Sequence, residues 1–124
     1  MYRYHENLYS KLWITEGVLH FVYKPIEYLD LKAARYIVRE RMKYQGDKAY
    51  PILCDIRGLG DADKSARDFL ALEGSTLAKA VAIVDDRDIA QAMFQVYTKR
   101  NKPIIPTLFF NDTEKALAFL KSYV

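Results

Sequence analysis

Two short apolar segments constrain the fold of this chain more than any other feature. Residues 50–55 and 79–84 are almost entirely apolar and show no clean polar alternation. Strands of this kind are typically buried on both faces, as in a parallel sheet that helices cover. Parallel neighbours need a crossover, and residues 56–78 between them contain a helical pattern. The two segments therefore predict an α/β fold with a parallel core.

The N-terminal residues predict a β-hairpin at one edge of this sheet. Residues 9–15 and 18–24 are rich in aromatic and β-branched side chains, and Glu16-Gly17 separates them. Glycine in a two-residue connection suits a tight hairpin turn. Pro25 then ends the second strand because proline cannot donate to the ladder.

Four helices are expected where an acidic or amide residue precedes an apolar helical pattern. The expected N-caps are Asp30, Asp63, Asp86 or Asp88, and Asn111 or Asp112. In the first helix Leu29 is expected to pack forward as a staple, and Gly46 is the expected stop. The residues expected to face inward on that helix are Leu31, Ala34, Ile37, Val38 and Met42.

The remaining elements complete one domain over residues 1–124. The third helix is expected to turn Ile89, Met93, Val96 and Tyr97 inward and to end at Asn101 and Pro103. The last strand is expected within 104–110. The predicted order is ββαβαβαβα, a mostly parallel five-stranded sheet with an N-terminal antiparallel hairpin and four helices.

Composition favours a globular protein of the cytoplasm. Of 124 residues 51% are hydrophobic and 28% charged, and no apolar run approaches the length of a membrane span. A net charge of +3 is too small to indicate nucleic acid as a partner, and Cys54 is the single cysteine, which suits a reducing compartment. The basic residues Lys32, Arg35, Arg39 and Lys43 form a stripe that is typical of a solvated helix face.

Carboxylates near the ends of the apolar strands raise the alternative of a metal or phospho-acceptor site. They are Asp55, Asp61, Asp63, Asp85, Asp86 and Asp88. Oxygen ligands of this kind suit a hard cation such as magnesium. Helix capping explains several of them equally well, and the lysine that a receiver domain needs after its last strand is replaced by Phe110-Asn111-Asp112. We therefore expect no metal and no cofactor.

Other chemical patterns are incomplete. Gly58 and Gly60 follow a strand, but the third glycine of a nucleotide-binding loop is replaced by Asp63, so turn geometry explains them better. Cys54 precedes an aspartate inside an apolar strand, which raises a thiol pKa and favours a structural role. His5 and His20 form no triad with it and no metal-ligand spacing.

The stretch from the central strand to the second helix resembles the STAS domain of the SpoIIAA-like anti-sigma-factor antagonists. That family typically has Asp-Leu-Ser-Gly after its third strand and Asp-Ser-Ser-Gly at the start of its second helix. Residues 55–58 (Asp-Ile-Arg-Gly) match the first block and residues 63–66 (Asp-Lys-Ser-Ala) the second. Lys64 stands where the family has its phosphorylated serine, and Asp61-Ala62 replace apolar residues before the cap.

The resemblance implies a non-enzymatic regulatory domain that docks a protein partner, with a homodimer as an alternative. The docking residues that it implies are Arg57, Gly58, Asp61, Asp63, Lys64, Ser65 and Asp68. No nucleic acid and no membrane insertion are expected. A second alternative is a small apolar ligand or lipid in an internal pocket. Its candidate lining residues are Phe69, Met93, Phe94, Tyr97, Phe109 and Phe110, which would otherwise be core.

Overall fold

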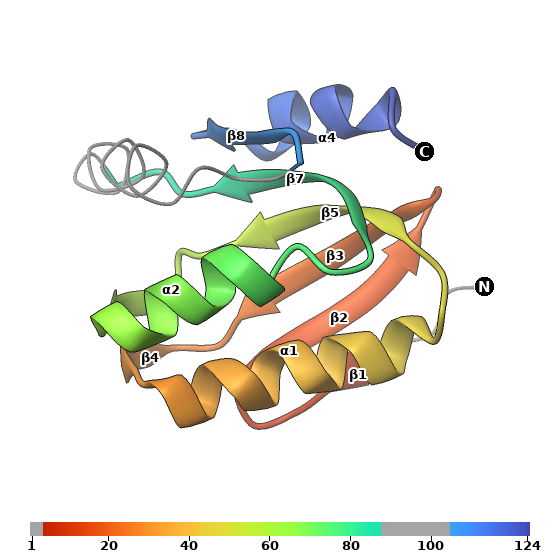
Figure 1. The fold of residues 1–124 in the computed structure, drawn as a ribbon. Helices are drawn as coiled ribbons and strands as arrows, with labels where there is room; N and C mark the ends of the chain where they lie inside the picture. The colour runs from red at the N-terminus through yellow and green to blue at the C-terminus, as the bar shows by residue number, and fades with distance from the viewer. Residues whose placement is uncertain (1–3, 88–104) are drawn as a thin grey trace.

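The computed structural model describes residues 4–87 and 105–124 of the chain (Figure 1). The strands are β1 (His5–Glu6), β2 (Ser10–Thr15), β3 (Val18–Tyr23), β4 (Ile26–Leu29), β5 (Tyr50–Asp55), β6 (Leu59–Ala62), β7 (Ala78–Val84) and β8 (Thr107–Phe110). The helices are α1 (Leu31–Gln45), α2 (Lys64–Glu73) and α4 (Thr113–Lys121). The helix predicted around residues 89–97, its possible cap Asp88 and its expected end at Asn101 and Pro103 lie outside the described residues.

The main sheet has the strand order β1-β2-β3-β5-β7-β8. β3, β5, β7 and β8 run parallel, and β1 and β2 add antiparallel pairs at one edge. This confirms the predicted α/β class, the parallel core and the hairpin. In the hairpin turn Glu16 and Gly17 both have positive φ, at 51° and 80°, as a two-residue turn of type I′ requires. The sheet has six strands and not the five predicted, because His5–Glu6 also pairs with β2.

A second, two-stranded sheet was not predicted. β4 pairs in parallel with β6, with Ile26 opposite Leu59 and Leu29 opposite Ala62. β6 lies within the segment between Asp55 and Asp63 that the sequence predicts as a loop. Its glycine and aspartate residues have low strand propensity, so only the pairing with β4 reveals it.

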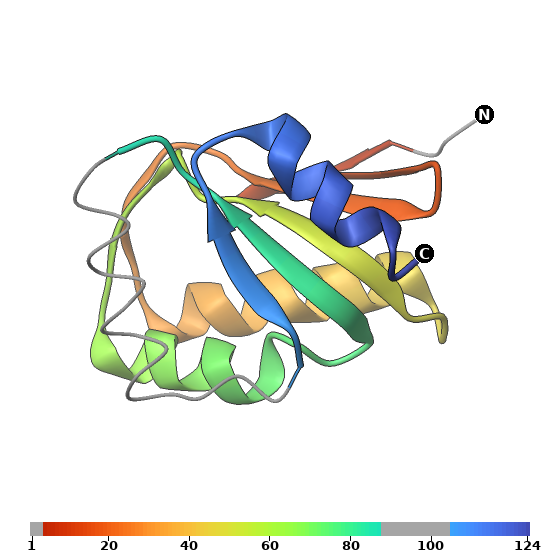
Figure 2. The ribbon, with the colours of Figure 1, turned by 90° about the horizontal axis from the view of Figure 1, so that it is seen from above.

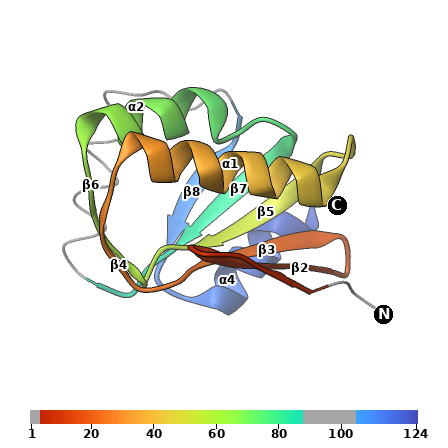
Figure 3. The same ribbon diagram turned by 90° about the horizontal axis from the view of Figure 1, so that it is seen from below.

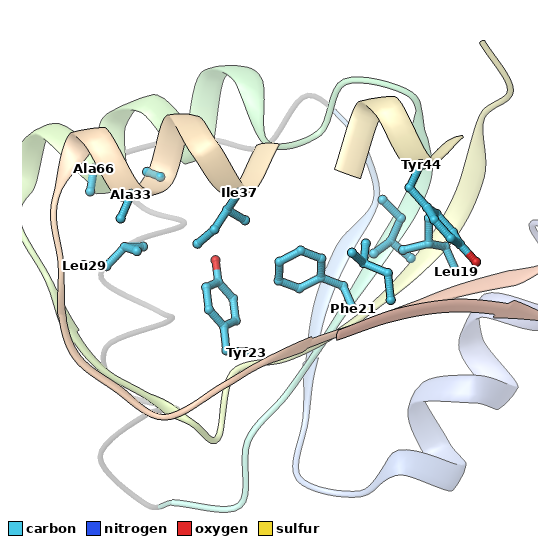
Figure 4. Packing of buried hydrophobic residues seen from close by; sticks show 11 residues of the cluster. Leu19, Phe21, Tyr23, Leu29, Ala33, Ile37, Tyr44 and Ala66 are labelled. Atoms are coloured by element: carbon cyan, nitrogen blue, oxygen red, sulfur yellow. The ribbon is translucent and has the colours of Figure 1, made fainter. Parts of the chain in front are cut away.

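The sheet is covered on both faces. Figures 2 and 3 show α1 and α2 on one face and α4 on the other. The core between the sheet and α1 includes Leu19, Phe21 and Ile37. Figure 4 shows the side chains of Leu19 and Phe21 in β3 pointing toward that helix. Leu53 and Leu120 belong to the core under α4. Within residues 4–87 and 105–124, no helix is both long enough and apolar enough to cross a membrane.

Three predicted caps are confirmed. The side chains of Asp30, Asp63 and Asp112 accept hydrogen bonds from the first-turn amides of α1, α2 and α4. Gly46 ends α1 with a φ of 69°. The burial predicted for α1 is only partly right, because Ala34, Ile37 and Val38 are buried whereas Leu31 and Met42 are half-buried. Two polar residues of α1, Arg41 and Gln45, are buried instead.

Candidate functional site

Asp55 and Arg57 form an ion pair at the end of β5. Asp55 is buried, and its carboxylate accepts a hydrogen bond from the backbone amide of Arg57 at 3.0 Å. Arg57 also reaches back with its guanidinium, through Nε to Oδ1 at 3.0 Å and Nη2 to Oδ2 at 2.7 Å. This bidentate geometry is the strong form of an arginine–carboxylate pair. The hydrogen bonds and the charge of Asp55 raise the pKa of Arg57.

The neighbouring strand β7 ends in the same way. Asp85 is fully buried and accepts from the backbone amide of Arg87 at 3.0 Å and from its Nε at 2.9 Å. Arg87 Nη2 also donates to the carbonyl of Ile56 at 3.1 Å, which joins the two strand ends. Burial alone would raise the pKa of Asp85, but the hydrogen bonds and charge of Arg87, with the charge of Arg57, lower it overall.

These pairs account for the carboxylates that suggested a metal site. Asp63 is occupied as the cap of α2, and Asp61 and Asp86 point to solvent as exposed residues. Asp88 lies outside the described residues. Among the residues that the structure describes, no three acidic, histidine or cysteine side chains lie close enough together to hold a metal ion. The arginines two positions after Asp55 and Asp85 are the sequence signal that would have predicted this neutralisation.

The two glycines after β5 have a packing role. A Cβ on Gly58 would lie 2.6 Å from the carbonyl oxygen of Tyr23, and one on Gly60 would lie 2.5 Å from that of Glu27. Both positions therefore need glycine because the chain entering β4 passes directly beside them. Gly58 also lies in the predicted turn, which Leu59 closes by donating its backbone amide to the carbonyl oxygen of Ile56 at 2.9 Å, whereas the close backbone approach at Gly60 within β6 was not predicted.

The surface formed by β6 and the start of α2 gathers most of the residues implied by the resemblance. Lys64 is the first residue of α2, its side chain is 77% exposed, and its Nζ lies 2.7 Å from Asp68 Oδ2. Ser65 beside it is exposed. Asp61 of β6 pairs with Tyr28 of β4, an exposed aromatic residue that sequence reasoning missed. We call the surface of Tyr28, Asp61, Lys64, Ser65 and Asp68 the β6–α2 surface.

Arg57 and Gly58 lie just before this surface, and each makes a structural contact of its own. Arg57 is turned toward Asp55 by its bidentate pair, and Gly58 is fixed against the backbone of residues 23 and 24. Asp63 contributes by capping α2 and so sets the direction in which Lys64 and Ser65 project. The structure places Lys64 beside Asp68 and leaves 48% of the Arg57 side chain exposed, so partner docking by these residues stays a prediction.

The cysteine and the histidines lie in separate structural environments. Burial and the nearby Asp55 raise the pKa of Cys54 to about 12, in the direction predicted, so the group is a neutral thiol near pH 7. His20 stacks on Trp13 with ring centroids 5.0 Å apart, and burial lowers its pKa. His5 belongs to β1, and its Nε2 lies 3.8 Å from Oε1 of Glu40 in α1.

A cavity of about 190 Å³ lies between the sheet and helices α1 and α2. Its walls are mainly apolar and include Phe21, Tyr23, Ile37, Ile52 and Ile83, of which Figure 4 shows the first three facing one another across the gap between β3 and α1. Three of the candidate lining residues, Phe69, Phe109 and Phe110, are not among the described residues that line it. Met93, Phe94 and Tyr97 lie outside the described residues.

One charged side chain, Arg41 of α1, is among the described residues that line this cavity. It is 4% exposed. Sequence reasoning missed it because Arg41 stands in a helix rich in exposed basic residues. Lys32, Arg35, Arg39 and Lys43 are all exposed, as predicted for that stripe. The only available signal was its position, four residues after Ile37 and three after Val38, on the apolar side of the helix.

Comparisons with known proteins agree with this architecture. The model of one protein family, described as a domain of unknown function (DUF7793), matches residues 12–124. A crystal structure of an uncharacterised protein from Shewanella loihica PV-4, of the DUF3478 family with a SpoIIAA-like fold, superimposes with a TM-score of 0.65. It shares 18% sequence identity, and the match covers 94% of this chain and 98% of that one. A search of curated proteins finds no match.

Proposed function

Because the chain belongs to the family of the domain of unknown function DUF7793 and has a SpoIIAA-like fold, we propose that it is a non-enzymatic interaction domain of the cytoplasm. Its β6–α2 surface would dock a protein partner. The observation that carries this proposal is that Lys64, with a side chain 77% exposed, lies in the first turn of α2, the helix that Asp63 caps. This is the place where STAS domains, by resemblance, present their regulated serine.

A lysine at this position changes the kind of regulation. Phosphorylation of a serine adds negative charge on demand, whereas Lys64 carries a permanent positive charge. The surface has both signs, because Asp68 pairs with Lys64 and Asp61 is exposed on β6. Mixed charge of this kind contributes to specificity and association rate more than to affinity. The expected partner therefore presents a carboxylate opposite Lys64, and its binding does not depend on a kinase acting at this position.

The proposal is tested by reversing the charge of Lys64. Lys64→Glu removes the exposed pair with Asp68, which contributes about 0.3–0.5 kcal/mol, and places an acid at a helix N-terminus, where it is favourable. The variant should therefore fold. The matched control is Lys115→Glu, the same substitution at an exposed first-turn position of α4 on the other face of the sheet.

The measurement is quantitative affinity capture from extracts of the native host, followed by mass spectrometry. We expect a polypeptide that the wild type and Lys115→Glu retain and that Lys64→Glu loses. Its binding to the purified domain should then show the same ranking and weaken with added salt. Equal recovery of that polypeptide with all three proteins would contradict the assignment of partner docking to the β6–α2 surface. Recovery of the chain itself as the retained species would identify a homodimer.

The cavity favours a second candidate function, the binding of a small apolar ligand. Its mainly apolar walls are the observation in favour. The two functions use different parts of the molecule, and each can be tested without the other.

A further inference from the structure

The environment of Arg41 is unusual for a buried cation. Its guanidinium donates to Gln45 Oε1 and, through Nη2, to the carbonyl oxygen of Gly74 at 3.0 Å. Both acceptors are neutral. In the described part of the chain, no carboxylate lies within 4.0 Å of it. Buried charges are usually paired, because an isolated one loses its hydration without compensation.

The electrostatics of the group agree with this geometry. Burial lowers the pKa of Arg41, and the opposing contributions come from Cys54 and Tyr23 and not from a carboxylate. Arginine nevertheless stays protonated near neutral pH, because its ordinary pKa is far above that range. The positive charge is therefore retained inside the fold with no countercharge from the described residues.

The guanidinium is also held in place. Gln45 Nε2 donates to the carbonyl oxygens of Lys48 at 3.0 Å and Leu77 at 2.9 Å. These two acceptors fix the amide orientation and direct its oxygen toward Arg41. The carbonyl of Gly74, at the end of α2, fixes the other side of the group. An arginine carries five N–H donors, so two neutral contacts position it without using its whole capacity.

We infer that the cavity binds a small monocarboxylic acid, whose carboxylate pairs with Arg41 and whose ring or short chain fills the apolar walls formed by Phe21, Ile37, Ile52 and Ile83. A carboxylate supplies the countercharge that the described residues lack, in the geometry that a guanidinium prefers. The inference is independent of partner docking, because Arg41 lies in the interior and Lys64 on the surface.

The volume and the lining residues of the cavity limit the class of ligand that fits. An apolar cavity of about 150 Å³ is known to accept benzene, so about 190 Å³ has room for one ring or a short aliphatic chain with an acid group. A phosphate dianion would need more than one cation, whereas Arg41 is the one charged group among the described lining residues. A neutral hydrocarbon would leave the guanidinium uncompensated.

The test uses the full chain with benzoate and hexanoate as probes, followed by calorimetry and by amide chemical shifts. Saturable binding of either acid is expected, with shifts at Phe21, Ile52 and Ile83. Benzamide, which has the shape of benzoate without its charge, should bind about 10- to 100-fold more weakly because it lacks the charge-assisted hydrogen bonds. Inorganic phosphate should not compete.

Two variants and one control separate the contributions. Arg41→Met removes the charge and should abolish the preference for benzoate over benzamide. Arg39→Met, an exposed arginine of the same helix, should leave it unchanged. Ala71→Leu fills the cavity from α2 while keeping Arg41, so it should weaken both acids even if Arg41→Met does not fold. Thermal unfolding confirms that each variant is folded.

The inference is wrong if neither acid binds the wild type saturably. It is also wrong if benzamide binds as tightly as benzoate, if phosphate competes, or if Arg39→Met reduces binding as much as Arg41→Met. The last two results would identify general anion attraction by the basic surface of α1.

Discussion

Replacing Asp85 by asparagine should destabilise the fold by about 2–3 kcal/mol. The side chain is fully buried and its oxygens accept from the backbone amide and the guanidinium of Arg87. Asparagine keeps the shape and one acceptor, but it loses the charge and turns an NH₂ group toward Arg87 Nη2. A hydrogen bond to a charged group contributes about 1.5–3 kcal/mol. The cost should stay below the 3–5 kcal/mol typical of a broken buried pair, because the Arg87 side chain is 39% exposed and can rehydrate.

Urea unfolding, followed by the fluorescence of the single tryptophan Trp13, measures this loss. Asp86→Asn is the control, since it removes the same charge at the next, exposed position and should change stability by no more than about 0.5 kcal/mol. Equal destabilisation by both substitutions would show that net charge and not the buried pair is responsible. No loss in Asp85→Asn would refute the reasoning altogether.

The same pair predicts a pH dependence. The pKa of Asp85 is lower in the folded protein than its ordinary value, so its stabilising contribution is complete above the ordinary pKa. That contribution is lost as the pH falls from the ordinary pKa through the folded-state pKa. The stability gap between wild type and Asp85→Asn should therefore be constant near neutral pH and close in acid. A gap that widened on acidification would contradict the direction of the shift.

Two further perturbations test the strand-end packing and the buried thiol. Gly60→Ala should destabilise the fold by about 1–3 kcal/mol in urea unfolding, because the new Cβ would lie 2.5 Å from the carbonyl oxygen of Glu27. The control is Asp61→Ala at the next position of the same strand, which is exposed and should cost no more than about 0.5 kcal/mol. Cys54 should react with a disulfide reagent at pH 8 far more slowly in the folded protein than in urea, because its pKa of about 12 leaves little thiolate. Equal rates in the two states would contradict a buried, protonated thiol.

The parallel core was predictable because local sequence carries the relevant signals. Burial on both faces removes polar alternation from residues 50–55 and 79–84, and Asp30, Asp63 and Asp112 satisfy amides within their own first turns. The β4–β6 pair was missed because its strands are four residues long and join segments about thirty positions apart. Nothing within residues 59–62 indicates a strand without the partner.

The strand-end carboxylates show why residue type alone misleads. Aspartates at the carboxyl edge of a parallel sheet fit a metal site, but Asp55 and Asp85 each have an arginine two residues later that turns back to the same carboxylate. The spacing is local and visible in the sequence, since Asp-x-Arg occurs at both strand ends. The repeated Asp-x-Arg spacing predicts the two ion pairs, whereas the number of aspartates alone suggested a metal site.

Arg41 is a different case, because its significance is not local at all. In α1 it is one basic residue among several, and its helical position alone allows either a snorkelling side chain or a buried one. What decides is Gly74, 33 residues away, whose carbonyl accepts from the guanidinium, and Gln45, which Leu77 fixes from 32 residues away. In the part of the chain that the structure describes, these long-range contacts orient the guanidinium through neutral acceptors, so its positive charge remains for a bound acid to neutralise. This is why the interior, and not the acidic strand ends, is the place to look for a ligand of this domain.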